Sequence, residues 1–199
     1  MFTGIVETVG RIVRIEKDID NLILHIESPI AHELKIDQSV AHNGICLTVT
    51  AINDSTHTVC AVPETIQKTS IATWQVEGKI NLERCMHLND RMDGHIVQGH
   101  VDTTALCTQR IDGINNWQFT FSIDSSFAPL IIEKGSVTVN GTSLTCFNVS
   151  PNSFDVAIIP YTFEHTNFPS IQVNSSVNIE FDIVGKYITR MLTLQTIKK

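Results

Sequence analysis

The sequence contains one segment twice, with two different reactive side chains at the matching position. "SVAHNGICLTV" runs from Ser39 to Val49 and "SVTVNGTSLTC" from Ser136 to Cys146, with six of eleven positions identical. Cys46 of the first copy therefore corresponds to Ser143 of the second. A thiol and a hydroxyl can each carry protons or assist addition to an electrophile, and the thiol is the more acidic. The pair predicts two similar sites with unequal chemistry.

Further blocks repeat in the same order and extend the duplication over about ninety residues. In pairs, they are "PETIQKTSI" from Pro63 with "PYTFEHTNF" from Pro160, "INLE" from Ile80 with "VNIE" from Val177 and, after a two-residue shift, "TGIVET" from Thr3 with "QGHVDT" from Gln98. A period this long indicates duplicated domains and not a solenoid. The boundary is expected near Asp93-Gly94.

The elements that position these residues are predicted to be strands. "LILHIES", "HTVCAV", "WQFTFSI" and "SFDVAII" are short, rich in β-branched and aromatic residues, and separated by turn residues. Asn43-Gly44 and Asn140-Gly141 are typical of type I′ hairpin turns, which need positive φ at both positions. Each copy is predicted to form a small antiparallel barrel or sandwich, and closure is favoured because it removes sheet edges.

Helices are predicted at three places. Ser28-Pro29 is expected to cap and begin a one-turn helix, and "SSFAPLIIEKG", closed by Gly135, is its counterpart in the second copy. At the end of the chain, an apolar stripe at helical spacing predicts a third helix, formed by Val184, Tyr187, Ile188, Met191 and Leu192. This stripe either packs on its own barrel or meets its copies in an oligomer.

Composition excludes several classes of protein. Lys+Arg 14 against Asp+Glu 21 gives a net charge of −7 without a basic run, which argues against nucleic-acid or membrane partners. The N-terminus lacks a secretory pattern and no apolar run reaches spanning length, so a cytoplasmic location is expected. Five scattered cysteines predict neither disulfides nor structural zinc. His95 and His100, five apart on a strand, would point to opposite faces, so no metal is predicted and His95 is interpreted as structural.

Seven motifs in order, "MFTGIV", "NGICLTV", "PETIQKTSI", "NLER", "GHIVQGHVD", "VNGTSLT" and "FDIVGKYITR", cover essentially the whole chain. Together they make it similar to the riboflavin synthase family. The resemblance implies an all-β fold of two tandem six-stranded antiparallel Greek-key barrels plus a C-terminal helix. The expected domains are residues 1–92 and 93–182, each a lumazine-binding barrel, and residues 183–199, an oligomerisation helix.

The resemblance also implies an activity and partners. Two molecules of 6,7-dimethyl-8-ribityllumazine would react by four-carbon transfer, giving riboflavin and 5-amino-6-(D-ribitylamino)uracil without a metal or organic cofactor. The implied assembly is a homotrimer in which the first barrel of one subunit faces the second barrel of its neighbour. Association with a lumazine synthase shell is left open.

Carrying the family's pocket segments over gives two sets of substrate-binding residues. The first set is Gly4, Ile5, Val6, Cys46, Leu47, Thr48, Cys60, Ala61, Val62, Pro63, Glu64 and Thr65. The second is Gly99, His100, Val101, Lys134, Ser143, Leu144, Thr145, Ala157, Ile158, Ile159, Pro160, Tyr161 and Thr162. The sets superpose under the repeat, and the glycines are expected to let backbone groups approach a flat heterocycle.

The two copies are expected to differ where chemistry occurs, because donor and acceptor lumazines must be treated unequally. The divergent pairs are Ile5 and His100, Cys46 and Ser143, Glu64 and Tyr161, and Asp37 and Lys134. His100 would carry the proton of the lumazine 7-methyl group, and Cys46, Ser143 and Thr145 would relay protons or stabilise an adduct. The same side chains could instead be ordinary buried or hydrogen-bonded strand residues. Asp182 is equally compatible with orienting a proton carrier and with capping the terminal helix.

The sequence departs from the family's usual motifs at two places. Ile45 stands where the family often has a second cysteine, and Asp93-Gly94 where it often has Gly-Gly. The main alternative is a non-catalytic lumazine- or flavin-binding antenna protein on the same fold, although such relatives tend to lose the second-pocket motifs and the terminal helix. A flavin-carrying reductase would need a nucleotide-binding domain for which no residues remain.

Overall fold

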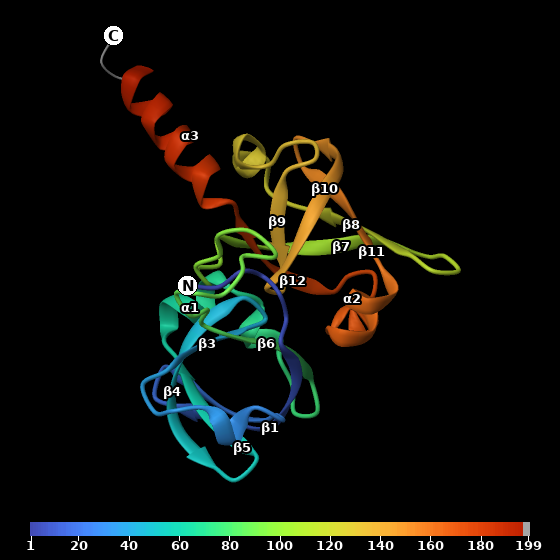
Figure 1. The fold of residues 1–199 in the computed structure, drawn as a ribbon. Helices are drawn as coiled ribbons and strands as arrows, with labels where there is room; N and C mark the ends of the chain where they lie inside the picture. The colour runs from blue at the N-terminus through green and yellow to red at the C-terminus, as the bar shows by residue number, and fades with distance from the viewer. Residues whose placement is uncertain (197–199) are drawn as a thin grey trace.

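Two closed antiparallel barrels and a terminal helix make up the fold in a computed structural model, which describes residues 1–196 (Figure 1). The first barrel consists of β1 (Thr8–Asp18), β2 (Asn21–Glu27), β3 (Ser39–His42), β4 (Ile45–Asn53), β5 (Thr56–Ala61) and β6 (Lys79–Arg84). The second consists of β7 (Thr103–Asp112), β8 (Trp117–Ser122), β9 (Ser136–Val139), β10 (Thr142–Ser150), β11 (Ser153–Ile158) and β12 (Ser176–Phe181). The predicted fold class is confirmed.

Strand order is the same in both barrels. The first runs β1-β2-β5-β4-β3-β6 and the second, read from β7, runs β7-β8-β11-β10-β9-β12. Every paired neighbour is antiparallel. The matching order is the structural counterpart of the sequence repeat.

Each barrel has its own hydrophobic core, and the two cores are packed with different side chains. The first is aliphatic, with Ile12, Leu24 and Ile26 fully buried. The second is built around rings such as Phe119 and Phe154. In both barrels every second residue of a strand faces inward. Aliphatic and aromatic side chains can therefore fill barrels of the same topology, as long as they match the available volume.

The two predicted hairpin turns meet at the junction between the barrels. Asn43 and Gly44 have φ of 46° and 79°, and Asn140 and Gly141 have 46° and 76°, which confirms the type I′ prediction. A Cβ on Gly44 would lie 2.8 Å from the backbone nitrogen of Gly141. Glycine is therefore required at these turns both for positive φ and for close approach.

Asparagine side chains join the barrels across this junction. Asn81 of β6 donates from Nδ2 to the Asn140 carbonyl, and Asn178 of β12 donates from Nδ2 to the Asn43 carbonyl, both at 2.9 Å. All four residues are buried. Because buried amides need their partners, this symmetric pair fixes one barrel against the other.

The short helices differ from the prediction in their limits. The observed ones are η1 (Ala31–Glu33), α1 (Pro63–Lys68), η2 (Ser70–Thr73), η3 (Ser125–Leu130), α2 (Pro160–His165) and η4 (Phe168–Ser170). The expected Ser28 cap is wrong, because its hydroxyl is buried without a partner and η1 begins three residues later. Gly135 does not close η3, which ends at Leu130 after Asp124 has capped its start. Both α1 and α2 begin at a proline, as its fixed φ favours.

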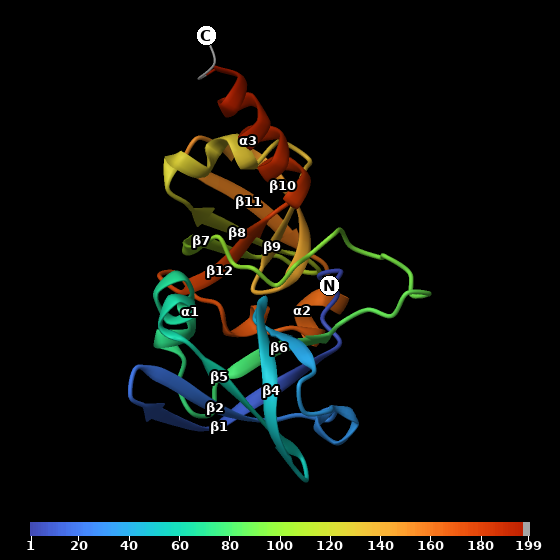
Figure 2. The same cartoon turned by 90° about the vertical axis from the view of Figure 1, so that its left-hand side faces the viewer.

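The terminal helix α3 (Ile183–Thr196) projects away from the barrels beyond the second one (Figures 1 and 2). Of the predicted apolar stripe, Val184, Tyr187, Ile188 and Met191 are each more than half exposed. The alternative in which this stripe packs on its own barrel is therefore wrong. Residues 197–199 of the predicted helix lie outside the described residues. Among residues 1–196, no helix is long and apolar enough to cross a membrane.

Candidate functional site

The segments that precede the two barrels are exchanged between them. Residues 2 and 97 form an antiparallel bridge, so the two segments run side by side between the barrels. The Gly4 carbonyl accepts from the Ser143 amide at 2.7 Å, and the Gly99 carbonyl accepts from the Cys46 amide at 2.8 Å. Val101 likewise packs against the core of the first barrel.

This exchange differs from the grouping that the repeat alignment predicts. Gly4 contacts Ser143 of the opposite copy, and Gly99 contacts Cys46, with Val101 packed beside it on the first barrel. Aligning the repeats groups residues by copy. The crossing arises from tertiary contacts between the copies, which such an alignment does not contain.

The two glycines serve these contacts. Gly4 and Gly99 both have φ of 78°. A Cβ would lie 2.7 Å from Ser143 Cβ at the first position and 2.6 Å from Cys46 Cβ at the second. The expected reason for glycine, close approach to a heterocycle, is thus replaced by close approach to the strand of the opposite barrel.

Two buried glutamates hold the exchanged segments in place. The carboxylate of Glu83 on β6 accepts from the Thr3 and Gly4 amides at 2.7 and 3.1 Å. The carboxylate of Glu180 on β12 accepts from the amides of residues 98, 99 and 100 at 2.8, 2.9 and 3.0 Å. Burial raises the pKa of both groups, that of Glu180 to about 7. Neither glutamate was among the predicted site residues, although each lies in a repeated block, "INLE" or "VNIE".

A hollow of about 490 Å³ lies on the outer face of the second barrel. It is lined by Lys134, Ser143, Leu144, Thr145, Phe147, Ala157, Ile159 and Thr162. Seven of these eight residues are in the predicted set. The structure therefore brings these residues together in one hollow.

Phe147 is the residue that the prediction missed in this hollow. It follows Ser143 and Thr145 at two-residue spacing on β10, so all three share one face, and this period is the signal that could have found it. The Lys134 ammonium lies 5.3 Å from its ring centroid, a cation–π contact. Under the repeat, Thr50 and Asp37 take these two positions in the first barrel. The hollow on the second barrel therefore combines an aromatic face with a cation, and the equivalent residues of the first barrel do not.

His95 lies against the predicted site residue Ser143. Its Nδ1 is 2.7 Å from Ser143 Oγ, and its Nε2 is buried without a hydrogen-bond partner. Burial lowers the pKa of His95, and the nearby Asp182 opposes this shift. The imidazole interpreted as structural is thus neutral at pH 7 and can exchange a proton with a hydroxyl.

His100 has a different environment. Its side chain is exposed, and its amide is held by Glu180. In the part of the chain that the structure describes, no group of three or more His, Cys, Asp or Glu side chains could hold a metal ion. The two histidines lie in separate places. His95 contacts β10 of the second barrel, and His100 lies on the segment that contacts the first barrel.

Cys46 is half-buried on the outer face of the first barrel, with Thr48 exposed beside it. Burial raises the pKa of the Cys46 thiol, so the group stays protonated at neutral pH. Cys46 is therefore a neutral proton donor, and its thiol is still the expected stronger acid in comparison with the Ser143 hydroxyl. All five cysteines are free thiols.

Three predicted binding residues have buried side chains. Leu47, Ala61 and Ile158 point into the barrel cores and are at most 5% exposed. They lie on strands whose alternate residues face outward. At these positions only the backbone could meet a ligand, whereas Val62, Ile159 and Tyr161 are exposed.

The structure assigns Asp182 to the start of the terminal helix. Its Oδ1 accepts from the Val184 amide at 2.9 Å, as an N-cap does. The same carboxylate is close enough to His95 to influence its pKa. Capping is therefore observed, and it does not exclude the electrostatic role.

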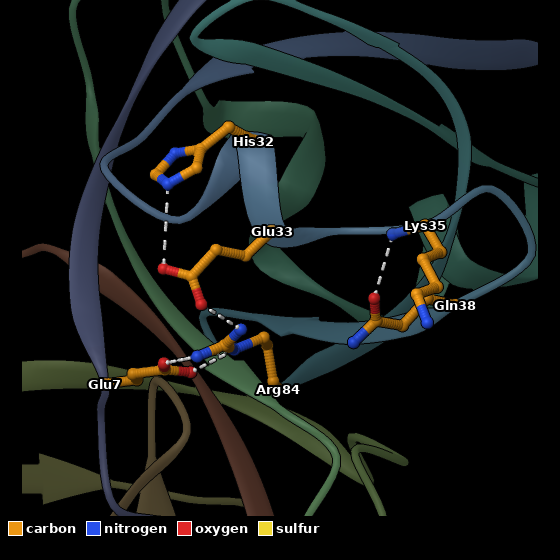
Figure 3. A network of polar contacts seen from close by, with 6 residues as sticks. All are labelled: Glu7, His32, Glu33, Lys35, Gln38 and Arg84. Carbon is orange, nitrogen blue, oxygen red and sulfur yellow. Dashed lines mark hydrogen bonds and ion pairs between the residues drawn. The ribbon is translucent and has the colours of Figure 1, made fainter.

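A larger cleft of about 890 Å³ beside the first barrel is lined mainly by charged residues. Ile5 contributes to it, whereas Cys46, Ser143 and His100 do not. Figure 3 shows one of its walls, where Arg84 donates to Glu7 and to Glu33, the latter at 2.9 Å. These groups are paired with one another, so the cleft is a less suitable place for the chemistry than the two strand faces.

Known proteins share both the sequence and the fold of this chain. The sequence model of the lumazine binding domain matches residues 3–85 and 98–182, one match for each barrel. Riboflavin synthase of Bacillus amyloliquefaciens is 42% identical over 193 residues, covering 96% of this chain and 90% of the relative. Riboflavin synthase of Bacillus subtilis is 40% identical over 207 residues, covering 100% and 96%.

Solved structures share the fold at lower identity. LumP in complex with riboflavin matches with a TM-score of 0.86 at 22% identity, over 91% of this chain and 99% of that one. LumP in complex with 6,7-dimethyl-8-(1'-D-ribityl) lumazine matches with a TM-score of 0.84, also at 22% identity and with the same coverage. The structural likeness shows the two-barrel fold, and the matches to the family model identify each barrel as a lumazine binding domain. The full-length sequence relatives are more specific, and the chain belongs to the riboflavin synthase family.

Proposed function

We propose that the protein is a riboflavin synthase that dismutates two molecules of 6,7-dimethyl-8-ribityllumazine. A four-carbon unit passes from one molecule to the other, giving riboflavin and 5-amino-6-(D-ribitylamino)uracil. The observation that carries the proposal is the pair of equivalent sites, each made of one barrel's strand and the other copy's glycine segment. A reaction between two copies of one substrate needs two similar binding places with different reactive groups.

The substrate is proposed to bind at the predicted residues in the grouping that the exchange gives. One lumazine lies on the second barrel between Lys134, Thr145 and the Gly4 segment, in the hollow lined by Phe147. The other lies on the first barrel between Cys46, Thr48 and the Gly99 segment. Hydroxyls such as those of Thr48 and Thr145 both donate and accept, as a dioxo-pyrimidine edge or a ribityl chain requires.

The reactive groups are assigned by their surroundings. The lumazine 7-methyl group must lose a proton before its carbon can attack the second ring. Ser143 paired with neutral His95 can accept that proton in the second site, since the imidazole lies 2.7 Å from the hydroxyl. Cys46, a neutral thiol, and the exposed His100 serve proton transfer at the first site. Thr145 assists in binding and proton relay beside Ser143.

The proposed division of the chain follows from these roles. Residues 1–92 and 93–182 each supply one lumazine-binding barrel, and the segment 183–199, whose described part is the helix α3, mediates oligomerisation. The exposed apolar residues of α3 support association through this helix, and the proposed assembly is a homotrimer in which the first barrel of one subunit faces the second barrel of its neighbour. That arrangement would bring two bound lumazines together.

The test of the function is direct conversion of substrate. The purified protein is incubated with 6,7-dimethyl-8-ribityllumazine, and absorbance is followed for the appearance of riboflavin. Turnover is expected without added metal and unchanged in EDTA. Ligand binding without any riboflavin would instead identify a lumazine-binding antenna protein.

A further inference from the structure

The acidic residue that follows each exchanged segment is clamped by a cation, and the two clamps come from different elements. Glu7 follows "TGIV" and Asp102 follows "QGHV", at corresponding positions of the repeat. Glu7 pairs with Arg84 of its own barrel strand β6 (Figure 3). Asp102 pairs with Lys186 of the terminal helix, at 2.6 Å from Nζ to Oδ2. Only the second clamp thus depends on α3.

The Asp102–Lys186 pair is much better shielded than a surface ion pair. Both side chains are only 20% exposed, whereas Arg84 and Glu7 are 29% and 34% exposed. Asp102 also accepts from the Phe181 amide at 2.8 Å through the same Oδ2 atom. A partly desolvated charge that loses its partner is far more costly than an exposed one. The position of Asp102 therefore depends on Lys186.

Asp102 is continuous with the segment that completes the site on the first barrel. Two residues before it, the His100 amide donates to Glu180, and three residues before it, the Gly99 carbonyl accepts from the Cys46 amide. Lys186 therefore lies at one end of a chain of contacts that passes through Asp102 and the segment 98–102 to Cys46. Within residues 1–196, the corresponding segment 3–7 has no ion pair with the helix.

We propose that Lys186 is a positioning residue that couples docking of the terminal helix to the lumazine site on the first barrel, through Asp102 and the segment 98–102. The inference rests on the proposed function for its substrate. It adds that the two sites differ in their dependence on the helix. Lumazine binding at the site containing Cys46 requires Lys186, and binding at the site containing Ser143 does not. The apolar stripe of α3 does not include Lys186, so assembly and positioning are separable.

The charge on Glu180 gives this coupling a characteristic pH dependence. The charged groups acting on that carboxylate are Lys186 from α3 and Asp102 from its own barrel, and Glu180 in turn raises the pKa of the Cys46 thiol. Burial raises the pKa of Glu180, and Lys186 partly opposes this shift. Without Lys186 the carboxyl holds its proton to higher pH, and as a neutral acid it accepts the three amides less well.

The test compares Lys186→Met with Arg190→Met, which removes an exposed cation one turn further along the same helix. Lys186→Met is expected to keep the oligomeric size of the wild type but to lose about tenfold in turnover, with activity partly recovering as pH rises from 7 to 9. Fluorescence titration with 6,7-dimethyl-8-ribityllumazine should show one of two sites weakened at least fivefold. Arg190→Met should match the wild type in every measurement, and Lys186→Arg should restore most of the turnover.

Amide hydrogen exchange tests the same proposal without catalysis. In Lys186→Met, the amides of residues 98–100 should exchange at least tenfold faster, while those of residues 3 and 4 stay protected by Glu83. Lys186→Gln, which keeps a donor for Asp102, replaces the methionine variant if that one fails to fold. Exchange and binding indistinguishable from Arg190→Met, or equal losses at both segments, would overturn the proposal. A wild-type protein that binds lumazine without turnover would refute the proposed function. The amide hydrogen exchange rates of Lys186→Met would still test whether Lys186 positions the segment 98–102.

Discussion

Positions 46 and 143 show how one fold can present two different reactive groups. Both residues meet a glycine carbonyl of the opposite copy through their backbone amides. Their side chains differ in partner, since Ser143 Oγ contacts the His95 imidazole while the Cys46 thiol lies beside the Ser39 hydroxyl and packs against Phe2, Ala41 and Val97. The same backbone frame thus holds a hydroxyl paired with an imidazole at one site and a neutral thiol at the other.

Cys46→Ser tests whether the thiol takes part in chemistry or only fills space. The second copy already has serine at this place, so the fold and lumazine binding should be retained. Turnover should fall at least tenfold, about 1.4 kcal/mol of barrier. Steady-state rates and ligand titration on the same sample measure the two effects. Full activity would make Cys46 a packing residue.

His95→Gln addresses the imidazole that contacts Ser143. Glutamine can still hydrogen-bond to the hydroxyl but cannot take its proton, so turnover should fall about a hundredfold while lumazine still binds. Because burial lowers the pKa of His95, the wild type should keep its activity as pH falls through 6.5, the usual value for histidine. A pH–rate profile of the wild type and of His100→Gln provides the comparison. A greater loss in His100→Gln, with an unchanged rate in His95→Gln, would assign removal of the 7-methyl proton to His100 instead of His95.

At the scale of elements, β3 and β5 carry a histidine pair inside the first barrel. His42 and His57 are fully buried, with their Nε2 atoms 2.8 Å apart. His42 Nδ1 donates to the Val40 carbonyl, so His57 must donate to His42 Nε2. His57 Nδ1 is then a buried acceptor without a partner. Such a pair is compatible with the apolar core only while both rings are neutral.

This pair predicts acid sensitivity of the first barrel. Burial lowers the pKa of His42 to about 3 and that of His57 to about 4, below the usual 6.5, so the unfolded chain takes up protons first as pH falls. Stability is fully present above pH 6.5 and is lost progressively toward pH 4, at up to about 1.4 kcal/mol per pH unit for each ring. Denaturant unfolding at pH 7.5 and 5.5 measures it. His57→Gln, which keeps an amide donor for His42, should have a smaller pH slope, and an unchanged slope would contradict the assignment.

For the whole molecule, the proposed mechanism depends on assembly through α3. Removing residues 183–199 should leave two folded barrels, because each barrel closes on itself and has its own core. Both should still bind lumazine, the site containing Cys46 more weakly because Lys186 is lost with the helix. Burial of the α3 stripe would contribute roughly 1.5–3 kcal/mol per large side chain, enough to determine the oligomeric state. The truncated chain should therefore be a monomer that makes riboflavin slowly, with a rate that rises with protein concentration. Size-exclusion chromatography and turnover are measured on the same truncated sample. Normal turnover by a dilute monomer would exclude a site formed between subunits.

The sequence by itself determined the duplication, the barrels and the turns between their strands. These features depend on local signals: β-branched strands, Asn-Gly pairs that favour positive φ, and a repeat that imposes one topology on both halves. Seven of the eight residues in the hollow on the second barrel were expected from the resemblance to the riboflavin synthase family and not from these local signals. The terminal helix followed from its 3.6-residue period, and its described part, Ile183–Thr196, agrees.

Only the tertiary structure decided which residues act together. The exchange of Gly4 and Gly99 between barrels, the contact of His95 with Ser143 and the clamp of Lys186 on Asp102 join positions 48 to 139 residues apart. No local propensity encodes such contacts, because they depend on how two finished barrels lie against each other. Burial likewise decided the protonation of Cys46 and Glu180, since the cost of removing a charge from water depends on the surroundings and not on the residue type.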